Sequence, residues 1–216
     1  NHRNIIQAIY NFEFAATSTA MVNMKTIEAM FASGNPPSSL LAVPLFHVSG
    51  LYAMFLLSLR GGRKIVMMYK WDPEKALQLI EQKKISTLSA VPTMVMDALD
   101  HPNFEQYDTS SLFALGSGGA ATPGRFRTLA NQKITHVYAG TGYGMTENNA
   151  TCSTGTGAAF EYKPKSAGTL SPIIDFKTCD EDGNTLPKGS TGEIWMKGPT
   201  VVQGYLNLSL IHISEP

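Results

Sequence analysis

Residues 85–119 read ISTLSAVPTMVMDALDHPNFEQYDTSSLFALGSGG and are the most informative stretch about the fold class. Ile85–Val91 and Leu112–Leu115 are short apolar runs, which are typical of buried strands. Between them, Thr93–Leu99 has apolar residues at helical spacing. Two strands separated by a helix favour a parallel β-α-β unit.

The same alternation extends to both sides of this unit. Apolar residues at helical spacing predict helices within Asn4–Phe31 and over Leu51–Leu59, the second one buried on most sides. Further short apolar runs predict strands over Ser39–Val43, Lys64–Met68 and Ile134–Tyr138.

Local chemistry marks two helix starts. Asp72-Pro73-Glu74 offers an N-cap side chain, a proline at the first helical position and an acidic first turn. Thr122-Pro123 predicts a second start. Residues 1–163 are therefore expected to form an α/β fold of parallel β-α-β layers.

The character of the sequence changes after Lys163. Glycines now separate short candidate strands such as Asp175–Thr178 and Glu193–Lys197, and Asp182-Gly183 is a turn signal of the hairpin kind. Residues 164–207 are therefore predicted to form a small antiparallel, barrel-like subdomain.

Composition excludes several classes of protein. The 17 basic residues balance the 17 acidic ones, so charge gives no support for a nucleic-acid partner. The longest apolar stretch, around Leu51–Leu59, is far shorter than a transmembrane segment. Cys152 and Cys179 lack the spacing of a zinc site or a disulfide framework, so a reducing, cytoplasmic location is expected.

The loop Gly140–Glu147, which reads GTGYGMTE after a predicted strand, has the residues for nucleotide chemistry. Glycines let a ligand approach the backbone, and Tyr143 offers a ring for stacking. The Thr146 hydroxyl suits phosphate oxygens, and the Glu147 carboxylate suits Mg2+. The alternative is a glycine-rich connection with a solvated Glu147. The spacing matches neither a Walker loop nor a dinucleotide fingerprint.

Two other loops follow predicted strands. Gly116–Ala121 reads GSGGAA and suits a ligand that lies against bare backbone, although such turns are common between strands and helices. Pro44–Leu51 contains one histidine, His47, at a predicted helix start. A lone histidine is more often a packing or capping residue than a catalytic one.

Together the three loops resemble the adenylate-forming (AMP-binding) superfamily of acyl-CoA synthetases, luciferases and peptide-synthetase adenylation domains. Tyr143–Glu147 is similar to its tyrosine-glycine-x-threonine-glutamate signature, Pro44–Gly50 to its aromatic-histidine motif, and Gly118–Ala120 to its small-residue pocket motif. A further family motif resembles Gly192–Trp195 with Gly198-Pro199 and Gly204-Tyr205, and residues 61–73 resemble the fatty acyl-CoA ligase branch.

The resemblance implies that ATP and a carboxylic acid form an acyl-adenylate, which coenzyme A then converts to a thioester. It implies catalytic roles for three residues: Thr146 on phosphate, Glu147 on Mg2+, and His47 in orienting the acyl carboxylate or gating the thiol. Tyr143 would stack on adenine, and Gly118–Ala120 would line the boundary between the adenine and acyl sites. The other nucleotide-binding positions implied are Gly142, Gly144 and Met145.

Several family elements have no counterpart in the sequence. These are the phosphate loop ending in lysine, the ribose-binding aspartate, the hinge and the small C-terminal domain with its lysine. The chain is therefore expected to be an internal fragment of the large N-terminal domain and catalytically incomplete. Residues 208–216 do not resemble the family and are predicted to be a non-native tail.

The leading expectation is a fragment of a fatty or related acyl-CoA ligase, with a fatty acid as substrate, and two alternatives remain open. One is another adenylate-forming branch, either an aryl-CoA ligase or a peptide-synthetase adenylation domain. The other is a truncated, non-catalytic nucleotide-binding module.

Overall fold

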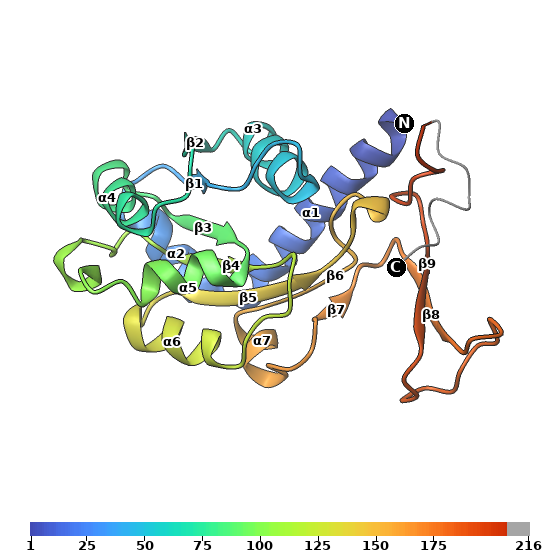
Figure 1. Ribbon diagram of the computed structural model, residues 1–216. Coiled ribbons are helices and arrows are strands. Elements are labelled where there is room, and N and C mark those ends of the chain that lie inside the picture. The colour runs from blue at the N-terminus through green and yellow to red at the C-terminus, as the bar shows by residue number, and fades with distance from the viewer. Residues whose placement is uncertain (207–216) are drawn as a thin grey trace.

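The computed structural model describes residues 1–206, and the predicted tail at 208–216 lies outside them. A seven-stranded sheet in the order β2-β1-β3-β4-β5-β6-β7 forms the centre of the molecule (Figure 1). β1 to β5 pair in parallel, and β6 and β7 add in antiparallel pairing at one edge. The strands are β1 Ser38–Leu41, β2 Lys64–Met67, β3 Thr87–Ala90, β4 Ala114–Ser117, β5 Tyr138–Tyr143, β6 Ser153–Thr156 and β7 Thr169–Leu170.

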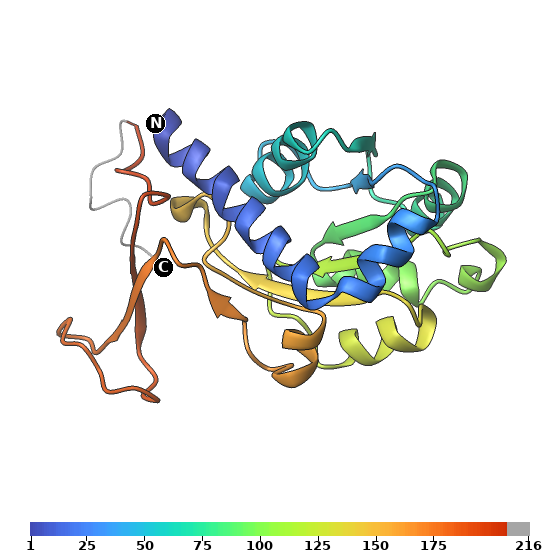
Figure 2. The same ribbon diagram turned by 180° about the vertical axis from the view of Figure 1, so that it is seen from behind.

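Helices cover both faces of this sheet. α1 and α2 lie on one face and α4, α5 and α6 on the other, as the two opposite views show (Figures 1 and 2). The predicted α/β class with parallel β-α-β layers is confirmed. The helices are α1 His2–Val22, α2 Met24–Ala32, η1 Ser49–Leu56, α3 Leu57–Arg60, α4 Pro73–Lys83, α5 Pro92–Leu99, η2 Phe104–Gln106, α6 Arg125–Lys133, η3 Thr146–Asn148 and α7 Ala158–Tyr162.

The main hydrophobic core lies between the sheet and the layer of α4, α5 and α6. Strand residues Leu88 and Leu115 face it, and Leu77, Ile80 and Phe126 come from the helices; each is at most 1% exposed. This packing fixes β3, β4 and β5 firmly from one side. Their opposite face, toward α1 and η1, is left for a cavity.

β8 (Asp175–Cys179) and β9 (Glu193–Lys197) form a separate antiparallel pair that stands away from the large sheet (Figure 1). The predicted antiparallel character of this region is therefore confirmed. Within residues 1–206 it is a two-stranded hairpin, not a closed barrel. β7 lies beyond residue 163 but pairs with β6 in the large sheet, so that sheet crosses the predicted domain boundary.

Several predicted elements differ from the structure. The strand predicted over Ile134–Tyr138 begins only at Tyr138, because residues 134–137 form the turn after α6. Gly116 and Ser117, predicted to begin a loop, are the last two residues of β4. Residues Gly140–Tyr143, predicted as a loop, continue strand β5, because β6 supplies hydrogen-bond partners that do not depend on side chains. The helix expected over Leu51–Leu59 begins as the π-helix η1, and most of its residues are half-exposed rather than buried. The helix predicted from Thr122-Pro123 begins at Arg125.

Two expectations from composition can also be compared with the structure. Cys152 and Cys179 are both free and buried, in line with the absence of a disulfide framework. No helix within residues 1–206 combines the length and apolarity that crossing a membrane requires.

Candidate active site

The turn that follows β5 carries the Thr146-Glu147 pair. Gly144 lies against the backbone here, because a Cβ at this position would overlap the carbonyl oxygen of Ala150. Asn149 and Ala150 both have positive φ, at 56° and 92°. A non-glycine residue at φ near 90° is strained, and such strain persists only where surrounding contacts hold it. Surrounding contacts must therefore hold this turn in its strained conformation.

Three buried asparagines provide these contacts. Asn148 accepts a hydrogen bond from the Met145 N–H at 3.1 Å, and Asn149 donates to the Thr200 carbonyl at 2.6 Å. From the start of α1, Asn4 donates to the Pro199 and Val201 carbonyls at 2.7 and 3.0 Å. The segment 199–202 is thus fastened both to α1 and to the Glu147 turn.

The Glu147 carboxylate is positioned from the same segment. The backbone carbonyl of Glu147 accepts a hydrogen bond from the Val202 N–H at 2.7 Å, and the Tyr205 hydroxyl donates to the Glu147 Oε1 at 2.6 Å. That hydrogen bond is the main reason why the pKa of Tyr205 is raised, since the phenol proton is held by a carboxylate. Tyr205 uses one carboxylate oxygen of Glu147 and leaves the other available to a ligand.

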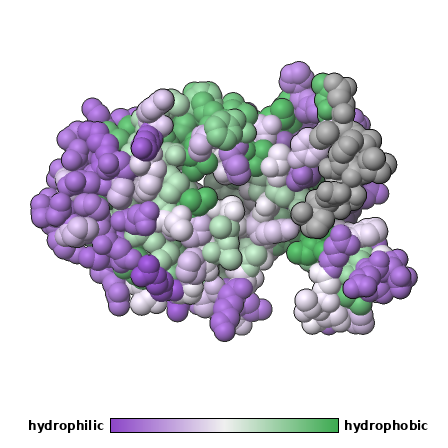
Figure 3. All heavy atoms as spheres, in the orientation of Figure 1, coloured by the Kyte–Doolittle hydropathy of each residue, from purple (hydrophilic) through white to green (hydrophobic). Residues whose placement is uncertain are grey.

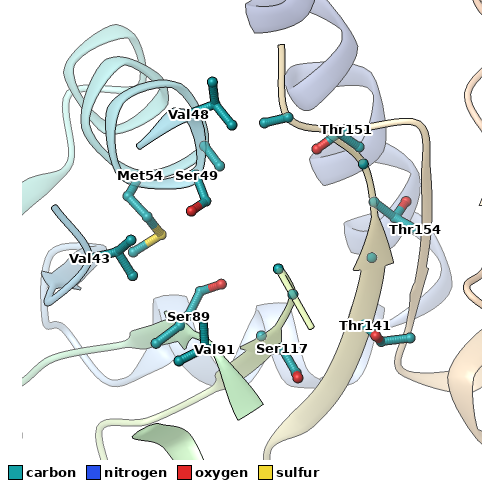
Figure 4. Close-up of a pocket in the computed structure, with 18 of the residues that line it drawn as sticks. Val43, Val48, Ser49, Met54, Ser89, Val91, Ser117, Thr141, Thr151 and Thr154 are labelled. Carbon is teal, nitrogen blue, oxygen red and sulfur yellow. The ribbon is translucent and has the colours of Figure 1, made fainter. Parts of the chain in front are cut away.

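A cavity of about 450 Å³ extends from this turn between the sheet and η1, which is within the range for small-molecule sites. Hydrophobic residues gather over η1 and α3, with a hollow below them (Figure 3). Figure 4 shows Met54 reaching from η1 toward Ser89 on β3. The residues that line this first cavity include Phe12, Val43, His47, Val48, Ser49, Met54, Ser89, Val91, Gly116, Gly118, Gly119, Gly140, Thr141, Gly142, Gly144, Met145, Thr146, Glu147, Thr151, Thr154 and Thr156.

His47 lines this cavity as an exposed residue next to η1. Its Nδ1 lies 2.7 Å from the Ser49 hydroxyl and accepts from the Ser49 N–H at 3.2 Å. These contacts orient the ring and leave Nε2 for a ligand. Phe46, the aromatic residue beside it, is 93% exposed.

A second cavity of about 470 Å³ adjoins the first. Ala120 and Tyr143 line it, and so does Lys165. Four residues, three of them glycines, line both cavities: Gly119, Thr141, Gly142 and Gly144. The two cavities therefore adjoin along these four residues, and ligands bound in them would lie next to each other.

Every residue predicted for the site lines one or both of these cavities. His47, Gly118, Met145, Thr146 and Glu147 line the first cavity. Ala120 and Tyr143 line the second, and Gly119, Gly142 and Gly144 line both. The structure thus brings the three predicted loops together, and the roles assigned to these residues remain predictions.

The Glu147 carboxylate also bears on whether Mg2+ fits this site. Within residues 1–206 no cluster of three or more His, Cys, Asp or Glu side chains could hold a metal ion, so this part of the chain offers no complete metal cage. Mg2+ at nucleotide sites is usually held by one or two carboxylates together with substrate phosphates and water. A single carboxylate with one uncommitted oxygen fits that pattern.

Sequence reasoning missed part of the site. Ser89, Thr154 and Thr156 line the first cavity, as do Phe12 on α1 and Met54 on η1. The asparagines at 4, 148 and 149 were missed as well. Only the Asn148-Asn149 pair gave a signal, since asparagine directly after a glycine-rich segment favours a left-handed turn residue.

Comparisons with known proteins agree with this geometry. The model of the family described as AMP-binding enzyme matches residues 1–206. A 4-coumarate–CoA ligase of Humulus lupulus is 34% identical over 172 residues, which cover 78% of this chain and 31% of that protein. The chain thus spans about a third of the length of the curated relatives it matches.

Solved structures show the same relationship. A putative long-chain-fatty-acid CoA ligase of Rhodopseudomonas palustris superposes with a TM-score of 0.72 at 26% identity, over 92% of this chain and 46% of that one. The o-succinylbenzoate CoA synthetase of Bacillus subtilis, solved with its acyl-adenylate intermediate, gives 0.71 at 27% identity, over 93% and 38%.

The predicted signature residues therefore meet at two adjoining cavities, on a fold shared with acyl-CoA-forming enzymes, within a match that spans residues 1–206. The chain belongs to the AMP-binding enzyme family.

Proposed function

We propose that this chain is the central part of an acid–CoA ligase, which activates a carboxylic acid with ATP and transfers the acyl group to coenzyme A. The observation that carries the proposal is that the two cavities adjoin along four shared lining residues, Gly119, Thr141, Gly142 and Gly144. Forming an acyl-adenylate requires a carboxylate and the α-phosphate of ATP to meet, and two adjoining cavities would bring the acid and the nucleotide together where they share these residues.

In this proposal the second cavity binds adenine, with Tyr143 stacking on the base and Gly119-Ala120 approaching it closely. The first cavity binds the acid and excludes water from the reactive adenylate. Thr146 donates its hydroxyl to a phosphate oxygen, and Glu147 holds Mg2+, which when bound neutralises phosphate charge. His47, oriented by Ser49, directs Nε2 toward the carboxylate or the incoming thiol.

Two classes of acid are candidates. A fatty acid is supported by the sequence of residues 61–73 and by the named activity of the Rhodopseudomonas palustris neighbour. An aryl acid is supported by the 34% identity to a 4-coumarate–CoA ligase. A peptide-synthetase-type adenylation domain and a non-catalytic nucleotide-binding module remain the alternatives.

The test is ATP–pyrophosphate exchange followed by thioester formation, using the full-length protein that carries this chain and a panel of acids. Acid-dependent exchange with coenzyme A-dependent thioester release is the expected result. Exchange without thioester formation would favour the peptide-synthetase alternative. ATP binding without exchange for any acid would favour the binding module.

Two further expectations belong to this proposal. The 216-residue chain alone is expected to be catalytically incomplete. A cytoplasmic location is also proposed, on the basis of the two free, buried cysteines.

A further inference from the structure

The floor of the first cavity is two rows of residues that run across four strands. In the deeper row, Ser89 on β3 pairs with Gly116 on β4, Gly116 with Gly140 on β5, and Gly140 with Thr156 on β6. The deeper row thus has glycines on the two central strands and larger side chains on the outer strands.

The outer row lies two residues further along the strands. Gly142 pairs with Thr154, Gly118 follows β4, and Val91 follows β3. Because side chains alternate along a strand, both rows face the same side of the sheet. The glycines of β4 and β5 therefore lie between side chains of β3 and β6 and form a trough, with Gly118 and Gly142 in its outer row and Gly116 and Gly140 in its deeper row.

The deep end of this trough is closed by side chains. Ser89 leans over Gly116, and the Thr156 methyl leans over Gly140, so that a Cβ on either glycine would overlap them. Tyr138 lies two residues before Gly140 on the same face of β5, so the trough meets a phenol ring here instead of another glycine. Burial raises the pKa of Tyr138, in line with a ring enclosed at this end.

The length of the floor limits what can lie on it. Ser89 and Thr156 cover the deeper glycines, so the open floor begins at the outer row and ends within two residues, roughly 7 Å at ~3.3 Å per residue. The floor is thus flat and short, with Met54 and Val48 of the η1 side above it (Figure 4). A flat ring fits this space better than a long flexible chain, which would have to pass Ser89, Thr156 and Tyr138.

The closed end is polar. Thr156 Oγ1 lies 2.6 Å from Thr19 Oγ1 on α1 and is thereby paired. The Ser89 hydroxyl lines the cavity and has no hydrogen-bond partner within the described residues. An alkyl chain would bury it unpaired, which is unfavourable, whereas a polar substituent on the acid would pair with it.

Resting on the proposed function, we propose that the acid is a compact aryl or arylalkenyl acid that lies flat on the glycine trough. Its carboxylate points toward Thr146, and a hydrogen-bonding substituent at its far end pairs with the Ser89 hydroxyl. Ser89 is a specificity-determining residue in this proposal, and Thr156 sets the length limit.

The experiment measures kcat/KM of the full-length protein for 4-hydroxycinnamate, cinnamate, hexanoate and palmitate. We expect 4-hydroxycinnamate to be the best substrate and palmitate the poorest. In Ser89→Ala, the preference for 4-hydroxycinnamate over cinnamate should fall by roughly 3- to 10-fold, the effect of one neutral hydrogen bond. Palmitate as the best substrate, or an unchanged preference in Ser89→Ala, would overturn the proposal.

Gly118→Ala tests the floor independently of Ser89. A Cβ there meets only the Gly142 carbonyl oxygen, at 3.7 Å, so the variant should fold. We expect KM for 4-hydroxycinnamate to rise about tenfold while KM for ATP changes little. Gly124→Ala, whose Cβ meets nothing within 4 Å, is the matched control. A rise in KM for ATP alone would contradict the trough as acyl site.

These outcomes separate the two proposals. If none of the acids supports pyrophosphate exchange, the proposed ligase function fails. If exchange is robust but long alkyl acids are used best, the ligase function stands and the aryl specificity fails.

Discussion

At the scale of single residues, Glu147 is the group whose charge the proposed chemistry needs. In the full-length protein, Glu147→Gln keeps the shape and the Tyr205 contact but removes the negative charge that would hold Mg2+. We expect pyrophosphate exchange to fall by about 100-fold, the scale for losing one electrostatic stabiliser. Glu181→Gln, in the exposed connection between β8 and β9, serves as control. Near-normal exchange across a Mg2+ titration would remove Glu147 from the metal site.

Asn149 combines two stabilising features that substitution can separate. It has φ of 56° and donates a hydrogen bond to the fully buried Thr200 carbonyl. Asn149→Gly keeps the backbone conformation and loses the bond, so urea denaturation should show a loss of about 1–3 kcal/mol. Asn149→Ala should cost about 1 kcal/mol more, because alanine disfavours positive φ. Equal stability of the two variants would show that the backbone conformation is not strained.

At the scale of elements, α4 depends on its first turn. The Asp72 carboxylate accepts a hydrogen bond from the Lys75 N–H at 2.7 Å, and Pro73 follows at the first helical position, as the sequence predicted. Asp72→Ala should lower the free energy of unfolding by about 1 kcal/mol in urea denaturation. Lys70→Ala, an exposed neighbour outside the helix, should change it little. Equal effects of the two substitutions would argue against the cap.

At the scale of the whole molecule, the arrangement of cations is the decisive feature. Within the described residues, the lining of the first cavity contains no lysine or arginine. The lining of the second cavity contains one such cationic residue, Lys165. Transfer from ATP requires several phosphate charges to be neutralised. The 216-residue chain alone should therefore support no pyrophosphate exchange with any acid in the panel. Robust exchange by the isolated chain would show that its own residues suffice.

The sequence by itself determined the class of fold and the location of the site along the chain. The alternation of apolar runs predicted parallel β-α-β layers, because each segment's periodicity depends only on its own residues. The Asp72-Pro73 helix start was readable for the same reason. The glycine-rich segments ending at Ala121 and Glu147 were identified from composition and spacing, and both line the cavities.

Only the tertiary structure decided which residues face one another across the sheet. β6 reads Ser-Thr-Gly-Thr and has no apolar pattern. It nevertheless pairs with β5 through backbone hydrogen bonds, which the side-chain pattern does not predict. Ser89 and Thr156 are far apart in the chain, but the register of four strands places them in one row. Register depends on pairing between distant segments, so the trough became visible only after folding.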